Sequence, residues 1–192
     1  MLINLKQMMK IAENDKIAIG SFNATGLDTL QAEIEAAEEL NVPVIVAHAE
    51  VHNIYNDISL IGPAMVEAAK KAKVPVCVHL DHGTSLDMVY KAFRYGFTSV
   101  MYDASALPYE ENVANTVKVM EIAKAIDVSV EAELGRLVTE EDGRNSQGMG
   151  SSNPEDFYTK PEQAKDFVNR TKIDALAIAF GTAHGFYKAE PR

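Results

Sequence analysis

Short apolar runs alternate with longer amphipathic segments along almost the whole chain, and this alternation limits the folds that it can adopt. The short runs are nearly continuously apolar, which is typical of strands in a parallel sheet whose outer face is covered by helices. We expect strands at residues 17–22, 43–48, 75–80, 99–102, 129–133 and 175–180. We expect helices between them at residues 27–40, 60–72, 85–95, 109–126 and 161–170.

Polar side chains gather where these runs end. This distribution is typical of a (β/α)8 TIM barrel, in which the loops after the strands build the site on one face. The alternative is an open doubly wound sheet, but no glycine fingerprint follows the first strand. The polar residues at the strand ends are Asn23, His48, Glu50, Asp81, His82, Asp103, Glu133 and His184.

We therefore predict an α/β protein whose single domain, residues 1–192, holds the first six βα units of a TIM barrel. A complete barrel takes about 250 residues, so we expect the domain to be incomplete at its C-terminal end. Residues 135–158 are rich in Gly, Ser, Asn and acidic residues, and we expect them to form a mobile loop at the active site.

Composition narrows the class of partners. The formal net charge of −10 argues against binding to nucleic acid or to an anionic membrane. If the substrate is a phosphate, the positive charge that binds it must be local. The one cysteine, Cys77, lies within an apolar run and fits a buried residue in a reducing compartment. The sequence shows no signal peptide and no apolar stretch of about 20 residues, so we expect a cytoplasmic location.

Two motifs carry the chemistry. His79-Leu80-Asp81-His82-Gly83 follows one apolar run, and Gly181-Thr182-Ala183-His184-Gly185 follows another about a hundred residues later. Two histidines at equivalent strand ends, one beside an aspartate, are what metal-assisted carbonyl chemistry requires. We expect the side chain of His79 to alternate away from the site if its strand is regular, and we expect Glu131 to be structural.

The chain from Ile19 to Lys188 resembles the class II, zinc-dependent ketose-phosphate aldolases almost continuously. The motifs occur in the order and at the spacing of that family. Besides the two histidine motifs, they are Gly96-Phe97-Thr98-Ser99-Val100-Met101-Tyr102-Asp103-Ala104-Ser105, Val130-Glu131-Ala132-Glu133-Leu134-Gly135 and Glu140-Glu141-Asp142-Gly143.

The resemblance implies a lyase that reversibly cleaves a phosphorylated ketose into dihydroxyacetone phosphate and an aldehyde, with Zn²⁺ as cofactor and a monovalent cation as a further ligand. It also implies a homo-oligomer, a dimer or a tetramer, in carbohydrate breakdown. The roles that it implies are zinc ligation by His82 and His184, nearby carboxylates at Asp103 and Glu133, proton transfer by Asp81 and Glu141, and substrate or phosphate binding by Asn23, His48, Gly185 and Lys188.

Two departures from the family pattern leave alternatives open. The third zinc histidine and the glycine-rich phosphate loop of the family have no counterpart up to Arg192, and residues 47–53 carry bulkier, ionisable side chains than fructose-bisphosphate enzymes show. The substrate therefore stays open between ketoses with one and with two phosphates. An inactive chain that binds metal or sugar phosphate is one alternative, and a metal-dependent hydrolase or isomerase on the same barrel is another.

Some residues keep a second interpretation. For His48 and His52, substrate contact and loop structure are equally compatible with the sequence. Asp103 and Glu133 are favoured as site residues over plain hydrogen-bonding residues at the strand ends.

Overall fold

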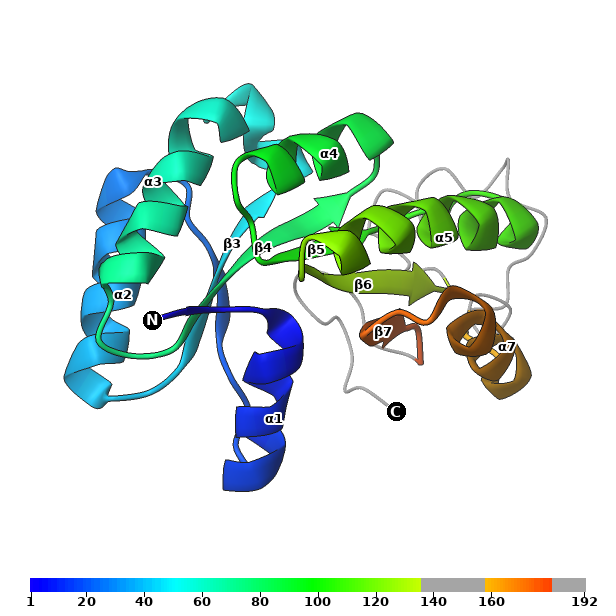
Figure 1. Cartoon of the computed structure of the whole chain (residues 1–192), viewed down its shortest axis with the longest axis horizontal. Coiled ribbons are helices and arrows are strands. Elements are labelled where there is room, and N and C mark those ends of the chain that lie inside the picture. Colours follow the sequence, from blue (N-terminus) through cyan, green and yellow to red (C-terminus); the bar gives the residue numbers. More distant parts are fainter. Residues whose placement is uncertain (136–157, 181–192) are drawn as a thin grey trace, which may run out of the picture.

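The computed structural model describes residues 1–135 and 158–180, which form a parallel β-sheet with helices along one face (Figure 1). The strands are β1 (Leu2–Ile3), β2 (Ser21–Asn23), β3 (Val44–Ala49), β4 (Val76–Gly83), β5 (Ser99–Tyr102), β6 (Ser129–Leu134) and β7 (Ala175–Ile178). The helices are α1 (Leu5–Asp15), α2 (Leu27–Leu40), α3 (Ile58–Lys71), α4 (Leu86–Arg94), α5 (Tyr109–Ala125) and α7 (Pro161–Thr171), with a short 3-10 helix, η1 (Glu50–Ile54), after β3.

The order of the strands agrees with the predicted barrel and not with the doubly wound alternative. The strands β2 to β7 are neighbours in the sheet in the same order as in the chain, and every pair is parallel. A doubly wound sheet reverses its strand order at a switch point, whereas a barrel adds each strand beside the previous one. The described part of the chain is therefore a partial barrel.

The core lies mainly between the sheet and the helices. The outward-facing side chains of β3 and β4, such as Val46 and Val78, are completely buried against α2, α3 and α4. A second, smaller cluster fills the opposite face, where Leu5 and Met8 of α1 pack against Cys77 and Ile45. Because strand residues alternate between faces, this inner cluster marks the lumen of the partial barrel. The prediction that Cys77 is buried is confirmed.

Helix α1 was not predicted, although Leu5, Met8, Met9 and Ala12 follow helical spacing; of these, Leu5 and Met8 are buried. Its start is nevertheless well defined, since the side chains of Asn4 and Gln7 form a capping box. The helix closes one end of the lumen. This placement also explains why the strand predicted at residues 17–22 begins only at Ser21. Residues 17–20 leave α1 as irregular chain, and the side chain of Ile19 joins the inner cluster.

The short elements β1 and η1 were not predicted either, and the remaining elements agree with the predicted ranges to within three residues at each end. Two predicted helix starts are confirmed: Ser85 accepts a hydrogen bond from the backbone N–H of Met88 as the N-cap of α4, and Pro161 occupies the first turn of α7. Among the described residues, no helix is both long enough and apolar enough to cross a membrane.

Candidate active site

A cavity of about 310 Å³ opens in the lumen beside the C-terminal ends of the strands. Its lining combines an apolar floor, to which Leu5 of α1 contributes, with a group of ionisable side chains on the strands β4 and β6. The lining residues are Leu5, Ser21, Ile45, His79, Asp81, His82, Met101, Glu131, Glu133 and Ala177.

The backbone of β4 turns two consecutive side chains into this cavity. Adjacent residues of a regular strand point to opposite faces, yet Asp81 and His82 both line the cavity. The cause is an irregularity: the register with β5 shifts between Leu80 and Gly83, and His82 adopts the left-handed conformation with φ of 45°. Glycine suits the next position, because a Cβ at Gly83 would lie 2.6 Å from the side chain of Leu80 and 3.0 Å from the carbonyl oxygen of Met101, so that a larger residue would force a shift.

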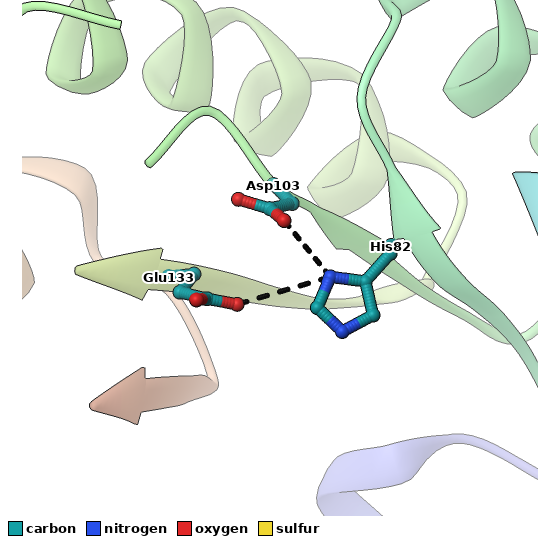
Figure 2. Close-up of side chains that lie close together, drawn as sticks. All are labelled: His82, Asp103 and Glu133. Carbon is teal, nitrogen blue, oxygen red and sulfur yellow. Dashed lines mark hydrogen bonds and ion pairs between the residues drawn. The ribbon is translucent and has the colours of Figure 1, made fainter. Parts of the chain in front are cut away.

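His82 meets two carboxylates from the neighbouring strands (Figure 2). Its Nδ1 lies 2.8 Å from Oδ2 of Asp103, just after β5, and 3.9 Å from Oε2 of Glu133 on β6. The second oxygen of Asp103 accepts hydrogen bonds from the N–H and the hydroxyl of Ser105, at 3.1 and 2.6 Å, which hold the carboxylate in place. Figure 2 shows the second ring nitrogen of His82 on the side away from both carboxylates.

The charges of this cluster are strongly coupled. The hydrogen bond with Asp103 raises the pKa of His82 to about 9. Burial works against ionisation of Asp103, but the hydrogen bonds from His82 and Ser105 outweigh it and lower the pKa of this carboxyl. Burial, followed by repulsion from Asp103, raises the pKa of Glu133 to about 7. Without a metal ion, the cluster therefore holds an imidazolium at neutral pH.

One nitrogen and two carboxylate oxygens from His82, Asp103 and Glu133 lie within 4.8 Å of one another, which is a donor set that can hold a metal ion. Imidazole and carboxylate are ordinary ligands for Zn²⁺. The raised pKa of Glu133 fits such a site, because a cation would relieve the repulsion between two carboxylates that are brought together. In a second arrangement Asp103 keeps its hydrogen bond with Nδ1 and a metal ion binds Nε2, which is usual for a metal-binding imidazole held by a carboxylate.

Asp81 is held from the other side by Asn23 at the end of β2. The Nδ2 of Asn23 donates to Oδ2 of Asp81 at 2.8 Å, and the second oxygen, Oδ1, lies 4.0 Å from Nε2 of His82. The two oxygens of Asp81 thus have different surroundings: one is bound by an amide, and the other faces the imidazole. The structure brings together five of the predicted site residues, namely Asn23, Asp81, His82, Asp103 and Glu133.

We predicted that the side chain of His79 points away from the site, and this prediction is wrong. His79 lines the same cavity. The reason is that β4 stays regular up to Leu80, so His79 shares the lumen face with Asp81, and it is His82 that departs from the alternation. Its Nδ1 lies 2.8 Å from the hydroxyl of Ser99, and its Nε2 lies 3.6 Å from Glu131. Burial lowers the pKa of His79 and raises that of Glu131.

His48 lies on the other side of the sheet. It is completely buried and pairs in register with Leu80, whose side chain belongs to the core between sheet and helices. Of the two interpretations of this residue, the structure favours a structural role, because His48 does not line the cavity. Burial lowers its pKa, so this imidazole is neutral. The predicted site residues Glu141, His184, Gly185 and Lys188, and nearly all of the predicted loop at 135–158, lie outside the described residues.

The described fold places this protein among barrel proteins with a candidate metal site. Its parallel sheet has sequential strand order and helices on the outer face, and a histidine–carboxylate cluster lies at the C-terminal edge of the sheet. The family model for class II fructose-bisphosphate aldolases matches residues 3–192. The chain therefore belongs to the class II fructose-bisphosphate aldolase family, which confirms the predicted resemblance.

Several relatives support this assignment. The chain is 43% identical to a probable fructose-bisphosphate aldolase of Bacillus subtilis, over 99% of this chain and 65% of the relative. It is 42% identical to the fructose-bisphosphate aldolase of Thermus caldophilus, over 100% of this chain and 61% of the relative. The chain thus spans slightly less than two thirds of the length of these relatives.

Solved structures agree with the fold. The YdjI aldolase from Escherichia coli superimposes with a TM-score of 0.84 at 35% identity, and the match covers 100% of this chain and 65% of that one. A putative fructose-1,6-biphosphate aldolase from Coccidioides immitis matches with a TM-score of 0.80 at 29% identity, over 96% and 63% of the two chains.

Proposed function

We propose that this chain carries the proton-transfer and metal-binding face of a zinc-dependent aldolase. The reaction is the reversible cleavage of a phosphorylated ketose into dihydroxyacetone phosphate and an aldehyde. One observation carries the proposal beyond family membership: the left-handed turn at His82 brings a candidate general base, Asp81, and a candidate metal ligand to the same cavity as adjacent residues.

In the cleavage direction, Asp81 accepts the proton of the C4 hydroxyl as the C3–C4 bond breaks, and the electron pair of that bond moves toward the C2 carbonyl oxygen. Oδ1 of Asp81 is the oxygen suited to this transfer, because Asn23 already occupies Oδ2 and fixes the carboxylate plane. A bound zinc ion would act as a Lewis acid that stabilises the negative charge developing on that oxygen.

His82 would ligate this ion through Nε2, with Asp103 holding the ring through Nδ1 and Glu133 as a further carboxylate on the Nδ1 side of the ring (Figure 2). His184 would be the second histidine ligand. Glu141 would return a proton to C3, and Gly185 and Lys188 would bind the phosphate or a monovalent cation. These four roles rest on the family resemblance alone, as do the cytoplasmic homo-oligomer and the place of the reaction in carbohydrate breakdown.

The test combines metal content with product release. We expect about one zinc per chain in the purified protein and almost none in the His82→Ala variant. The Asp81→Asn variant should retain zinc but lose cleavage of ketose phosphates, measured as dihydroxyacetone phosphate in a coupled assay. Asp87→Asn is the matched control, because Asp87 is an exposed aspartate of α4 that pairs with Lys91.

Two results would contradict the proposal in different ways. A protein without zinc would remove the metal-dependent mechanism. Zinc binding without release of dihydroxyacetone phosphate from a panel of ketose phosphates would instead support a hydrolase or isomerase.

A further inference from the structure

Glu50, the first residue after β3, accepts hydrogen bonds from two consecutive residues after β4. Its Oε2 accepts from the N–H and the hydroxyl of Thr84, at 2.6 and 3.1 Å, and from the N–H of Ser85 at 3.1 Å. Its Oε1 accepts from the hydroxyl of Ser85 at 2.8 Å. A single carboxylate therefore binds four donors of one short segment, although Glu50 does not line the cavity.

Thr84 and Ser85 connect the end of β4, which contains His82, to the start of α4. Ser85 is also the N-cap of that helix, since its hydroxyl accepts from the N–H of Met88 at 3.1 Å. On the near side, the carbonyl of Gly83 accepts from the N–H of Asp103 at 3.0 Å. The turn that contains His82 is therefore anchored by β5 through Gly83 and by η1 through Glu50.

The conformation of His82 needs such anchors. A left-handed residue other than glycine is strained, and it persists only when its surroundings fix it. If the Thr84–Ser85 segment were released, a regular extension of β4 would relieve the strain. Regular alternation would then turn the imidazole away from the face that Asp81 occupies, and so away from Asp103.

The chemistry of Glu50 suits the role of an anchor. All four groups that it binds are donors, so a carboxylate can satisfy them together, whereas the amide of a glutamine would direct its own N–H groups at the hydroxyl of Ser85 or at the three donors that bind Oε2. The negative charge also lies at the N-terminus of α4, where the helix dipole and the charge-assisted hydrogen bonds strengthen the contact.

We propose that Glu50 is a positioning residue, which holds Thr84 and Ser85 so that His82 keeps its left-handed conformation and presents its imidazole to Asp103 and the metal site. Glu50 is not one of the residues that line the cavity, so it would act through Thr84 and Ser85. Its effect on metal binding and on catalysis rests on the proposed function, whereas its effect on the His82 ring does not.

The test is the Glu50→Gln variant in metal-free protein, studied by NMR. We expect the backbone N–H groups of Thr84 and Ser85 to exchange with solvent roughly tenfold to a hundredfold faster. We also expect the Nδ1–H signal of His82, which reports its hydrogen bond with Asp103, to shift or disappear. Glu38→Gln is the matched control, because Glu38 also accepts a backbone N–H, that of Lys73 at 2.8 Å, but far from the site. It should change exchange at Lys73 and leave His82 unchanged.

Thr84→Val provides a second variant, should Glu50→Gln fail to fold. It removes only the weakest side-chain donor, and it should change the His82 signal in the same direction by a smaller amount. Normal His82 signals in a folded Glu50→Gln protein, or in Thr84→Val protein with faster exchange at Ser85, would overturn the proposal.

Zinc titration separates the two proposals. If the wild-type protein binds zinc, Glu50→Gln should weaken its affinity roughly tenfold to a hundredfold, as expected for residues that orient metal ligands. The visible spectrum of the Co²⁺-substituted protein should also change. Unchanged zinc affinity and an unchanged Co²⁺ spectrum in Glu50→Gln would refute only the role proposed for Glu50. A wild-type protein that binds no zinc would refute the proposed function, and the NMR result would then decide on the role of Glu50.

Discussion

Replacing Asp103 with asparagine tests the electrostatics of the His82 cluster directly. The carboxylate accepts from Nδ1 of His82 at 2.8 Å through one oxygen and from Ser105 through the other. An asparagine has one acceptor oxygen, so it can keep one of these contacts but must direct its N–H groups at the other donor. We therefore expect the pKa of His82 to fall in the Asp103→Asn variant.

The size of the fall follows from the structure. The pKa of His82 rises from 6.5 to about 9, and the difference corresponds to about 3.4 kcal/mol as an upper limit. The side chain of His82 is 33% exposed, so solvent screening reduces this value. Asp81, at 4.0 Å, and Glu133, at 3.9 Å, also remain in the variant and favour the imidazolium. Glu133 in turn ionises more readily once Asp103 is neutral. We expect a fall of about one to two pKa units, or about 1.4–2.7 kcal/mol.

The assay is an NMR titration of the His82 ring C–H signals in metal-free protein, with the His82→Ala variant to assign them. Asp87→Asn serves again as the matched control and should leave the pKa of His82 unchanged. A pKa in the Asp103→Asn protein within about half a unit of the wild-type value would refute the reasoning, because the hydrogen bond to Asp103 is the largest cause of the shift.

The remaining predictions concern pH, catalysis and the core. The pKa values of Glu133 and His82 are raised to about 7 and about 9, so the native state retains protons that the unfolded chain has lost. The buried His79 and His48, whose pKa values are lowered, oppose this effect only up to about pH 6.5. The free energy of unfolding of metal-free protein should therefore fall as the pH rises from about 6.5 to about 9, measured by urea denaturation, and a rise in this range would contradict the raised pKa of His82. Zinc binding should release more than one proton near pH 7, one from His82 and part of one from Glu133. Calorimetry in buffers of different ionisation enthalpy can count these protons, and release of none would be inconsistent with an imidazolium at His82. Asn23→Ala should lower kcat about tenfold to a hundredfold with unchanged zinc content, since it removes the 2.8 Å hydrogen bond that fixes Asp81, and an unaltered kcat would rule out that role. Phe167→Ala should lower the free energy of unfolding by about 3–5 kcal/mol, because Phe167 is completely buried. Its neighbour Val168 is 38% exposed, so Val168→Ala should cost much less, and equal losses would mean that Phe167 is not in the core.

Much of the fold could be predicted from local patterns. The alternation of apolar runs with amphipathic segments is a property of neighbouring residues, and the ranges of α2 and β5 agree with the structure at both ends. The buried Cys77 and the N-cap Ser85 follow from the same short-range logic. Helix α1 was missed although its sequence carries local signals, namely apolar residues at helical spacing and the capping-box pair Asn4 and Gln7. Only the tertiary structure shows that Leu5 and Met8 of this helix pack in the lumen.

The site was predicted in composition but not in detail. Because parallel strands end at the same edge of the sheet, the polar residues after β4, β5 and β6 had to lie close together. Which face each side chain occupies depends on the backbone. The alternation rule indicated that His79 would point away from the site, whereas the structure places it in the cavity beside Asp81.

By itself, the sequence determined the α/β class, the order of the elements and the residue types at the strand ends, because these depend on local periodicity and on family motifs. Only the tertiary structure decided that His48 is buried on the helix side and that a left-handed His82 joins Asp81 in one cavity. The physical reason is that a single positive φ reverses the direction of a side chain. This angle is maintained by contacts with residues far away in the sequence, such as the four hydrogen bonds that Glu50 accepts from Thr84 and Ser85.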